Sequence, residues 1–353
     1  MANWPASRYR LYWLWPSDYN LAQIRNNRSQ TLGTNKATSV NGNLKPHAFF
    51  QGAVVPMDEA KVSVTTHALH YGTAVFEGIR GNWNEEQGKM FIFRMREHYE
   101  RLIRGCKILL LDIPYTSEQL CEITVDLVTR NGHQSDIYIR PLAYKSAEVV
   151  ANLKLQELAS DFTLVTVPFG NYLGTDILRC CTSSWRRVDD NMIPTQIKSA
   201  GIYVNSMLAK TEATLAGFDE AIILNQDGHV SEGSGENVFM VSGGKLHTPS
   251  LEDNALPGIT RDTIIQLAQD ELGLEVVERS IDRSELYLCD EIFLSGTAAH
   301  LTPVVELDCR NIGDGEPGSV STSLQKMYFD IVAGRNSKYL HWCTEVTPQT
   351  VPA

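Results

Sequence analysis

The chain has 353 residues, of which 43% are hydrophobic and 21% charged, and its formal net charge is −11. This balance is typical of a globular protein, and the length predicts two domains with a sizeable core. The negative charge argues against nucleic acid or an anionic membrane as a partner, and no run approaches the roughly 20 apolar residues of a membrane span. Seven cysteines without C-x-x-C spacing favour reduced thiols in a cytoplasmic protein.

Residues 1–45 differ in composition from the rest of the chain. Aromatic residues crowd the start, and a polar stretch rich in Asn, Ser, Thr and Gly follows from Asn26 to Asn43. A basic start, an apolar core and a small-residue cleavage site, which together mark a signal peptide, are not evident. We expect a disordered or accessory extension, with an aromatic docking segment as the alternative.

Strand and helix patterns alternate after this extension. β-rich runs predict strands over 49–55, 90–93, 137–144 and 162–167. Apolar residues recur at helical spacing from Met95 to Leu109, which predicts a helix facing the core. A second helix is expected from a cap at Ser117 to a closing Gly132.

The Pro- and Gly-containing stretch that starts at Pro168 interrupts this pattern and predicts an interdomain linker. We expect a small N-terminal α/β domain over 46–167, a linker over 168–177 and a larger C-terminal domain over 178–345. In the C-terminal domain we expect strands over 219–225, 237–241 and 291–294, turns at 226–229 and 242–244, and a helix over 260–272.

Lys198 is followed by the small residues Ser-Ala-Gly, so it can enter a cleft and lose part of its hydration. Desolvation lowers the pKa of an amine, which favours Schiff-base formation, although most lysines are solvated surface groups. Tyr203 could donate a hydrogen bond to a phenolate, and an acid could face a protonated ring nitrogen. A lysine, a tyrosine and an acid are the groups that pyridoxal 5′-phosphate requires. The residues alone do not choose between Glu232 and Glu236.

Three further patterns each have an ordinary interpretation and a functional one. The turn at 255–261 leads into a helix whose free N–H groups could bind an anion, or it is a plain Pro-Gly turn with a Thr cap. Tyr138 and Arg140 project from one face of a strand, which could be an ordinary polar face. His67 and His70 suggest a metal, but a third ligand of suitable spacing is missing, so we expect none.

Four ordered segments resemble the successive signatures of branched-chain amino-acid aminotransferases, which are fold-type IV enzymes. These segments are 198–205, 231–237, 255–261 and 295–299. The resemblance extends from about Ala48 to about Leu340. It implies a mixed α/β fold like that of D-amino-acid aminotransferase, in two domains joined by a short linker. It also implies a homo-oligomer, either a dimer or a trimer of dimers, in which a neighbouring subunit completes the pocket.

The resemblance also implies a role for each matched residue at the pyridoxal 5′-phosphate site. Lys198 forms the internal aldimine and moves the proton, Tyr203 contacts the phenolate oxygen, and Glu232 is selected as the partner of the ring nitrogen. The phosphate is expected at Arg101, Ile259, Thr260 and Thr297. The residues Leu256, Gly258 and Gly296 complete the cofactor site.

For the substrate pocket, the resemblance implies an apolar wall with one cation at its rim. Arg140 receives the distal carboxylate of glutamate, for which its planar fork is suited. The implied pocket residues are Tyr71, Phe76, Tyr138, Arg140, Phe169, Tyr172, Thr297 and Ala298. The expected reaction converts L-leucine, L-isoleucine or L-valine and 2-oxoglutarate into branched-chain 2-oxo acids and L-glutamate. Alternatives are D-amino-acid or amine transamination, aminodeoxychorismate lysis, and cofactor binding without turnover.

Overall fold

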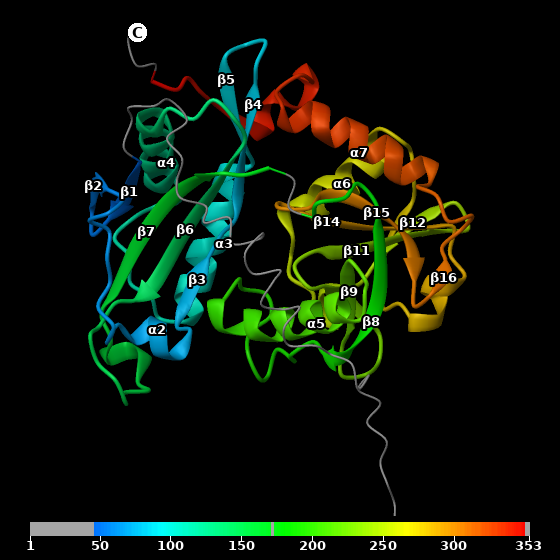
Figure 1. Ribbon diagram of the computed structural model, residues 1–353, viewed down its shortest axis with the longest axis horizontal. Coiled ribbons are helices and arrows are strands. Elements are labelled where there is room, and N and C mark those ends of the chain that lie inside the picture. The colour runs from blue at the N-terminus through cyan, green and yellow to red at the C-terminus, as the bar shows by residue number, and fades with distance from the viewer. Residues whose placement is uncertain (1–45, 171–172, 350–353) are drawn as a thin grey trace, which may run out of the picture. The chain divides into compact units, whose positions relative to one another are not determined.

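The computed structural model describes residues 46–170 and 173–349 (Figure 1). The predicted extension over 1–45 and the predicted pocket residue Tyr172 lie outside the described residues. Among the helices that are described, none is long and apolar enough to cross a membrane.

The first sheet contains eight of the described strands, all paired antiparallel, in the order β17-β5-β4-β6-β7-β1-β2, with β3 paired to β6. Its strands are β1 His47–Phe50, β2 Ala53–Pro56, β3 Ala74–Phe76, β4 Ile79–Asn84, β5 Lys89–Phe93, β6 Ile137–Lys145, β7 Ser160–Pro168 and β17 Cys343–Val346. Helices α3 (Met95–Ile108) and α4 (Ser117–Asn131) pack against this sheet through a shared apolar core. Tyr99 and Leu102 of α3 and Leu120 of α4 are fully buried there.

The second sheet is mixed and contains nine of the described strands, in the order β10-β9-β8-β15-β14-β11-β12-β13, with β16 paired to β15. Its strands are β8 Leu178–Arg186, β9 Glu220–Leu224, β10 Val230–Gly233, β11 Asn237–Ser242, β12 Lys245–Thr248, β13 Val276–Glu278, β14 Glu291–Gly296, β15 His300–Leu307 and β16 Arg310–Asn311. Side chains alternate between two apolar clusters, because successive strand residues face opposite sides. Phe239 and Phe293 stack in one cluster, while Val238 and Leu294 belong to the other.

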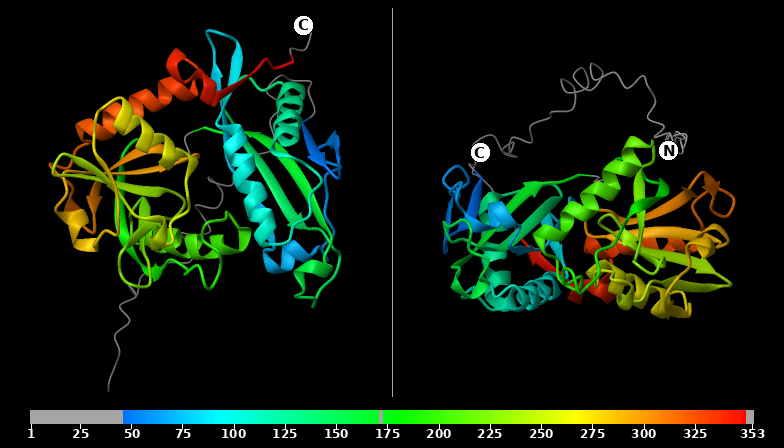
Figure 2. Two further views of the ribbon diagram at one scale, coloured as in Figure 1. Left: turned by 180° about the vertical axis from the view of Figure 1, so that it is seen from behind. Right: turned by 90° about the horizontal axis from the view of Figure 1, so that it is seen from below.

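Helices flank this second sheet (Figures 1 and 2). The remaining helical elements are α2 His67–Tyr71, α5 Tyr203–Leu215, α6 Ile259–Asp270, α7 Ser319–Val332, η1 Leu155–Glu157, η2 Ala200–Ile202, η3 Leu251–Asp253, η4 Arg283–Tyr287 and η5 Ser337–Trp342. α5 packs on β8 and β9, whereas α6 and α7 share a core with β11 and β14.

Most predicted elements are confirmed, with two local corrections. The single strand expected over 49–55 is wrong, because Gln51 and Gly52 adopt positive φ and form a turn that makes β1 and β2 a hairpin. Ser117 is not the cap of α4. Thr116 is, because its extended backbone lets the side chain accept from Gln119 N in a capping box.

The chain passes from the first sheet to the second between Pro168 and Leu178, where we predict the linker. The domain boundaries themselves stay a prediction. The last strand, β17, returns to pair with β5 of the first sheet, although the predicted boundaries assign nearly all of it to the second domain.

Candidate active site

Lys198 lies in the segment between β8 and α5, directly before η2, and this segment is joined to the first sheet. Phe76 N donates to Lys198 O at 3.0 Å, and Val75 forms an isolated bridge with Ser199. A Cβ at Gly72 would lie only 2.9 Å from Gly201 Cα, so the two backbones meet where both residues lack side chains. The contacts of β3 therefore fix a lysine that comes more than a hundred residues later in the chain.

The amine of Lys198 lies beside two aromatic rings, those of Phe76 and Tyr203, which pack on each other with ring centres 4.8 Å apart. Its Nζ is 5.4 Å from the ring centre of Phe76 and 5.3 Å from that of Tyr203. Burial alone would lower the pKa of Lys198, but electrostatic interaction with Tyr203, then with Glu77 and Tyr138, outweighs it and raises the pKa above its usual value. The expectation of a lowered pKa for Lys198 is therefore wrong.

Arg101 of α3 is held by a buried network that the sequence did not reveal. Its Nε and Nη2 donate to the two carboxylate oxygens of Glu77 at 2.7 Å each, and its Nη1 donates to Pro257 O at 2.7 Å. His98 Nδ1 donates to the same carboxylate at 2.7 Å. Burial would raise the pKa of Glu77, but Arg101 and His98 outweigh it and hold that pKa well below its usual range. Two of the five N–H groups of Arg101 stay available to a ligand.

The start of α6 lies beside Arg101. Gly258 is the N-cap, and no side chain caps the helix, so the Thr cap of the ordinary interpretation is absent and the first N–H groups are open to an anion. A Cβ at Gly258 would lie 2.0 Å from Asn237 Oδ1, so only glycine fits there. Because Arg101 binds Pro257 O, the structure brings Arg101, Ile259 and Thr260 together at one anion site.

The two acids of the 231–237 segment have different surroundings. Glu232 accepts from Leu256 N at 2.8 Å and forms an ion pair with Arg187 Nη2 at 2.8 Å, and both charged residues are buried. Glu236 is also buried, and its carboxylate accepts only from Gly235 N, at 3.0 Å, with no ion-pair partner among the described residues. Glu232 is thus the acid with a fixed cation, and Arg187 is a residue that sequence reasoning missed.

A connected group of pocket candidates starts at Phe76, which lies beside Lys198, and continues through Arg140 and Tyr138 to Phe169. The guanidinium of Arg140 lies 4.5 Å from the ring centre of Phe76 and 5.0 Å from that of Tyr138, and it donates to Tyr138 Oη at 3.2 Å. Tyr138 packs on Phe169 with ring centres 4.8 Å apart. Arg140 is exposed, so its outer N–H groups can meet a ligand.

Unpartnered polar groups show that these residues fit a polar, phosphorylated ring such as pyridoxal 5′-phosphate. The buried hydroxyls of Ser199, Ser231 and Ser295 have no hydrogen-bond partner within the described chain. They are sequence neighbours of Lys198, Glu232 and Gly296. The uncapped start of α6 and the free N–H groups of Arg101 provide donors for the phosphate of such a ring.

A family model described as amino-transferase class IV matches residues 74–307. The chain belongs to this family. It is 49% identical to the probable branched-chain-amino-acid aminotransferase of Aquifex aeolicus (strain VF5), over 85% of this chain and 96% of that one. It is 40% identical to the branched-chain-amino-acid aminotransferase of Escherichia coli (strain K12), over 85% and 97%.

Solved structures of similar proteins confirm the predicted class IV fold. The branched-chain aminotransferase of Thermoproteus uzoniensis, solved with norvaline, has a TM-score of 0.81 at 45% identity, covering 85% of this chain and 99% of that one. The branched-chain amino acid aminotransferase of Thermobaculum terrenum, solved in its PLP-form, has a TM-score of 0.79 at 39% identity, covering 86% and 98%.

In this class IV aminotransferase, a second buried arginine joins the linker to the turn after β14. Arg80 donates to Ala298 O at 3.3 Å, and to Phe169 O and Gly170 O at 3.2 and 3.0 Å. Thr297 lies in the same turn, directly after Gly296. Arg80 was missed in the sequence, where it is one polar residue in a strand.

Tyr71, another pocket candidate, makes its contacts outside the group around Phe76 in this aminotransferase. It is 42% exposed, its hydroxyl accepts from Ala151 N at 3.0 Å, and its ring packs on His67 at 4.5 Å. Both ring nitrogens of His67 are hydrogen bonded, to Thr73 Oγ1 and Asn152 O. Across the described residues, no group of three His, Cys, Asp or Glu could hold a metal ion.

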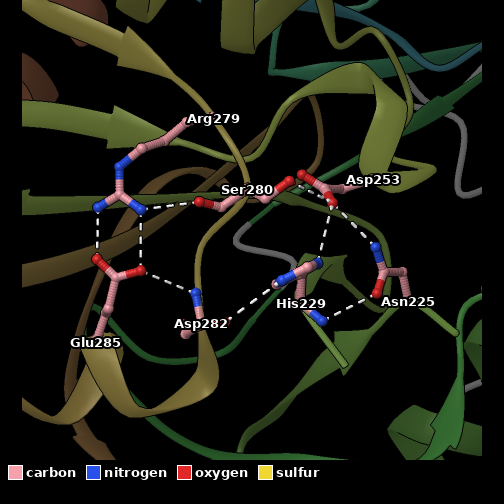
Figure 3. A network of polar contacts seen from close by, with 7 residues as sticks. All are labelled: Asn225, His229, Asp253, Arg279, Ser280, Asp282 and Glu285. Atoms are coloured by element: carbon pink, nitrogen blue, oxygen red, sulfur yellow. Dashed lines mark hydrogen bonds and ion pairs between the residues drawn. The ribbon is translucent and has the colours of Figure 1, made fainter. Parts of the chain in front are cut away.

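The loop before α6 is anchored in the aminotransferase by a polar network (Figure 3). Asp253 Oδ1 accepts from Asn225 Nδ2 at 2.9 Å and from Ser280 Oγ at 3.1 Å. His229 lies between two acids, with Nδ1 4.0 Å from Asp253 and Nε2 3.4 Å from Asp282. This network fixes the start of the loop whose later residues contact Glu232 and Arg101.

Proposed function

We propose that the protein is a branched-chain amino-acid transaminase that uses pyridoxal 5′-phosphate and transfers the amino group of L-leucine, L-isoleucine or L-valine to 2-oxoglutarate. The observation that carries the proposal is the joint placement of Lys198, the ion-paired Glu232 and the uncapped start of α6 beside Arg101. The names of the similar proteins support the same activity.

In the proposed site, each end of the cofactor meets a different part of the chain. The N–H groups of Ile259 and Thr260 and the free donors of Arg101 hold the phosphate. Glu232, which is ion-paired with Arg187, would bind the ring nitrogen and stabilise its proton. The bound cofactor supplies an electron sink for the negative charge that develops at Cα of the substrate.

Lys198 tethers the cofactor and then acts on the substrate. When it is not holding the cofactor, the Lys198 amine would take the proton from Cα of the substrate as general base and would return a proton as general acid. The rings of Phe76 and Tyr203, which pack on each other beside Nζ, limit where the amine can move.

Substrate recognition divides between a carboxylate site and a side-chain site. The Tyr138 hydroxyl and the N–H groups of Thr297 and Ala298 bind the α-carboxylate, and Arg80 holds that turn through Ala298 O. Phe76 packs on an apolar side chain, and Arg140 pairs with the distal carboxylate of glutamate.

We also propose that the protein acts as a cytoplasmic homo-oligomer, a dimer or a trimer of dimers. Support comes from apolar side chains left exposed on α2 and α5, among them Leu69, Val204 and Met207 at 65%, 56% and 57%. Tyr71, which is 42% exposed, is available to complete a neighbour's pocket. Seven free thiols agree with a reducing compartment.

A substrate panel tests the proposal. L-leucine, D-alanine, an aryl-ethylamine and aminodeoxychorismate are each offered, with 2-oxoglutarate as acceptor for the amines, and the products are quantified. We expect glutamate formation with L-leucine as the fastest reaction. Preference for any of the other three, or cofactor binding without turnover, would contradict the proposed function.

A further inference from the structure

Three buried carboxylates meet two cations next to the proposed cofactor site. Glu220, which is fully buried, pairs with Lys210 at 2.5 Å, and Glu232 pairs with Arg187 at 2.8 Å. Glu236 is only 4% exposed and has no ion-pair partner within the described part of the chain. A buried carboxylate without a cation is costly, and such a group usually keeps its proton instead.

The side chain of Glu236 fills the space between two glycines that flank the site. A Cβ added to Gly233 would lie 2.9 Å from Oε2 of Glu236. A Cβ added to Gly296 would lie 3.5 Å from Cγ of Glu236. Its backbone O accepts from Gly233 N at 2.6 Å. Glu236 therefore contacts both the bend that carries Glu232 and the turn that leads to Thr297.

Charged and titratable groups face Glu236 from four elements: Glu220 from β9, Lys210 from α5, Glu232 from β10 and the thiol of Cys180 from β8. Burial raises the pKa of Glu236 to about 8, and repulsion by Glu220 and Glu232 acts in the same direction. The hydrogen bond from Gly235 N–H and the charge of Lys210 lower this pKa, but they offset only part of the increase.

We propose that Glu236 is a positioning residue that works as a neutral carboxylic acid. It packs the 231–237 bend against the turn after Gly296, and its neutrality leaves Glu232 as the negative charge of that bend. Above its pKa, ionisation adds a second, uncompensated negative charge between the two segments and loosens the site. The link to catalysis rests on the proposed function, whereas the charge state of Glu236 does not.

The charge state is tested by thermal unfolding of the full-length protein between pH 5 and 9.5, with and without added pyridoxal 5′-phosphate. Because the folded pKa of Glu236 lies above the unfolded one, wild type loses stability as the pH rises from the ordinary glutamate range to about 8. Glu236→Gln is isosteric and does not titrate, so its Tm should exceed that of wild type by a gap that grows over this range by about 5 °C. Glu316→Gln, which changes an exposed carboxylate, should show no such gap.

Glu236→Met gives a second neutral side chain of similar length, so the test survives if one variant fails to fold. A Tm gap that is independent of pH for the folded variants would overturn the proposal.

The second experiment measures the rate with L-leucine and 2-oxoglutarate as a function of pH. Wild type should lose activity above about pH 8, and Glu236→Gln should retain it. If Glu236→Gln instead abolished activity at pH 7, Glu236 would act as a carboxylate and the proposal would be wrong. An absence of transamination in wild type would refute the proposed function and leave the Tm result standing.

Discussion

Arg140→Ala should separate the two halves of the proposed reaction. The guanidinium of Arg140 rests on Phe76 and Tyr138 and keeps its outer donors exposed. Leucine offers it no charge to bind, whereas glutamate brings a second carboxylate that needs a fixed cation.

The size of the effect follows from these contacts. A charge-assisted hydrogen bond is worth about 1.5–3 kcal/mol, which corresponds to roughly ten- to a hundredfold in kcat/KM for glutamate. Loss of an exposed cation–π contact removes about 0.5–1 kcal/mol of packing, which affects both substrates by a few-fold only. Arg140→Ala should therefore slow the half-reaction with glutamate about tenfold or more beyond its effect on leucine.

The assay mixes each amino acid separately with the cofactor-loaded enzyme and follows the cofactor absorbance before steady state. Arg140→Lys keeps the charge without the planar fork and should fall between wild type and Arg140→Ala for glutamate. Arg130→Ala removes an exposed arginine of α4 and should leave both half-reactions unchanged. Equal losses for the two amino acids in Arg140→Ala would show that Arg140 serves the α-carboxylate or the cofactor, and would refute the reasoning.

Four further outcomes are expected. Lys198→Ala should lose transamination by several orders of magnitude because tether and proton carrier disappear together, and a near wild-type rate in a leucine assay would disprove its role. Glu232→Gln should slow proton abstraction by roughly 10²-fold, measured as loss of the Cα deuteron from labelled leucine, and a harmless change would reassign the ring-nitrogen partner. Glu77→Gln leaves the guanidinium of Arg101 buried and unpaired, so urea unfolding should show a loss of about 3–5 kcal/mol. The folded pKa of Glu77 is lowered, so its contribution is present above the ordinary glutamate range and fades as the pH falls, and a loss that did not shrink in acid would contradict this. A chain that starts at Pro46 should keep its activity and its assembly state by size-exclusion chromatography, and loss of either would indicate that residues 1–45 dock on the rest.

Local patterns in the sequence were sufficient for the elements and motifs whose structure depends on near neighbours. The apolar spacing from Met95 predicted α3, and the turn at 255–261 predicted a helix start. Lys198 and Glu232 could be proposed as site residues because each lies within a short ordered motif. The hairpin at Gln51 and Gly52 was missed, since a two-residue turn inside an apolar run leaves the β-rich composition unchanged.

The tertiary structure decided which charges meet. Glu77 lies 24 residues before Arg101, and Arg187 lies 45 residues before Glu232, and neither pair has a periodic signal that joins it. The residues alone likewise left the choice between Glu232 and Glu236 open. Among the described residues, Glu232 has a cationic partner, Arg187, and Glu236 has none. A pKa depends on the sum of burial and of nearby charges, and for Lys198 the contribution of Tyr203 is joined by those of the distant Glu77 and Tyr138, so the raised pKa could not follow from the neighbouring residues alone. Local propensity acts over a few residues, whereas electrostatic and packing energies act over a few ångströms between residues that only folding brings together.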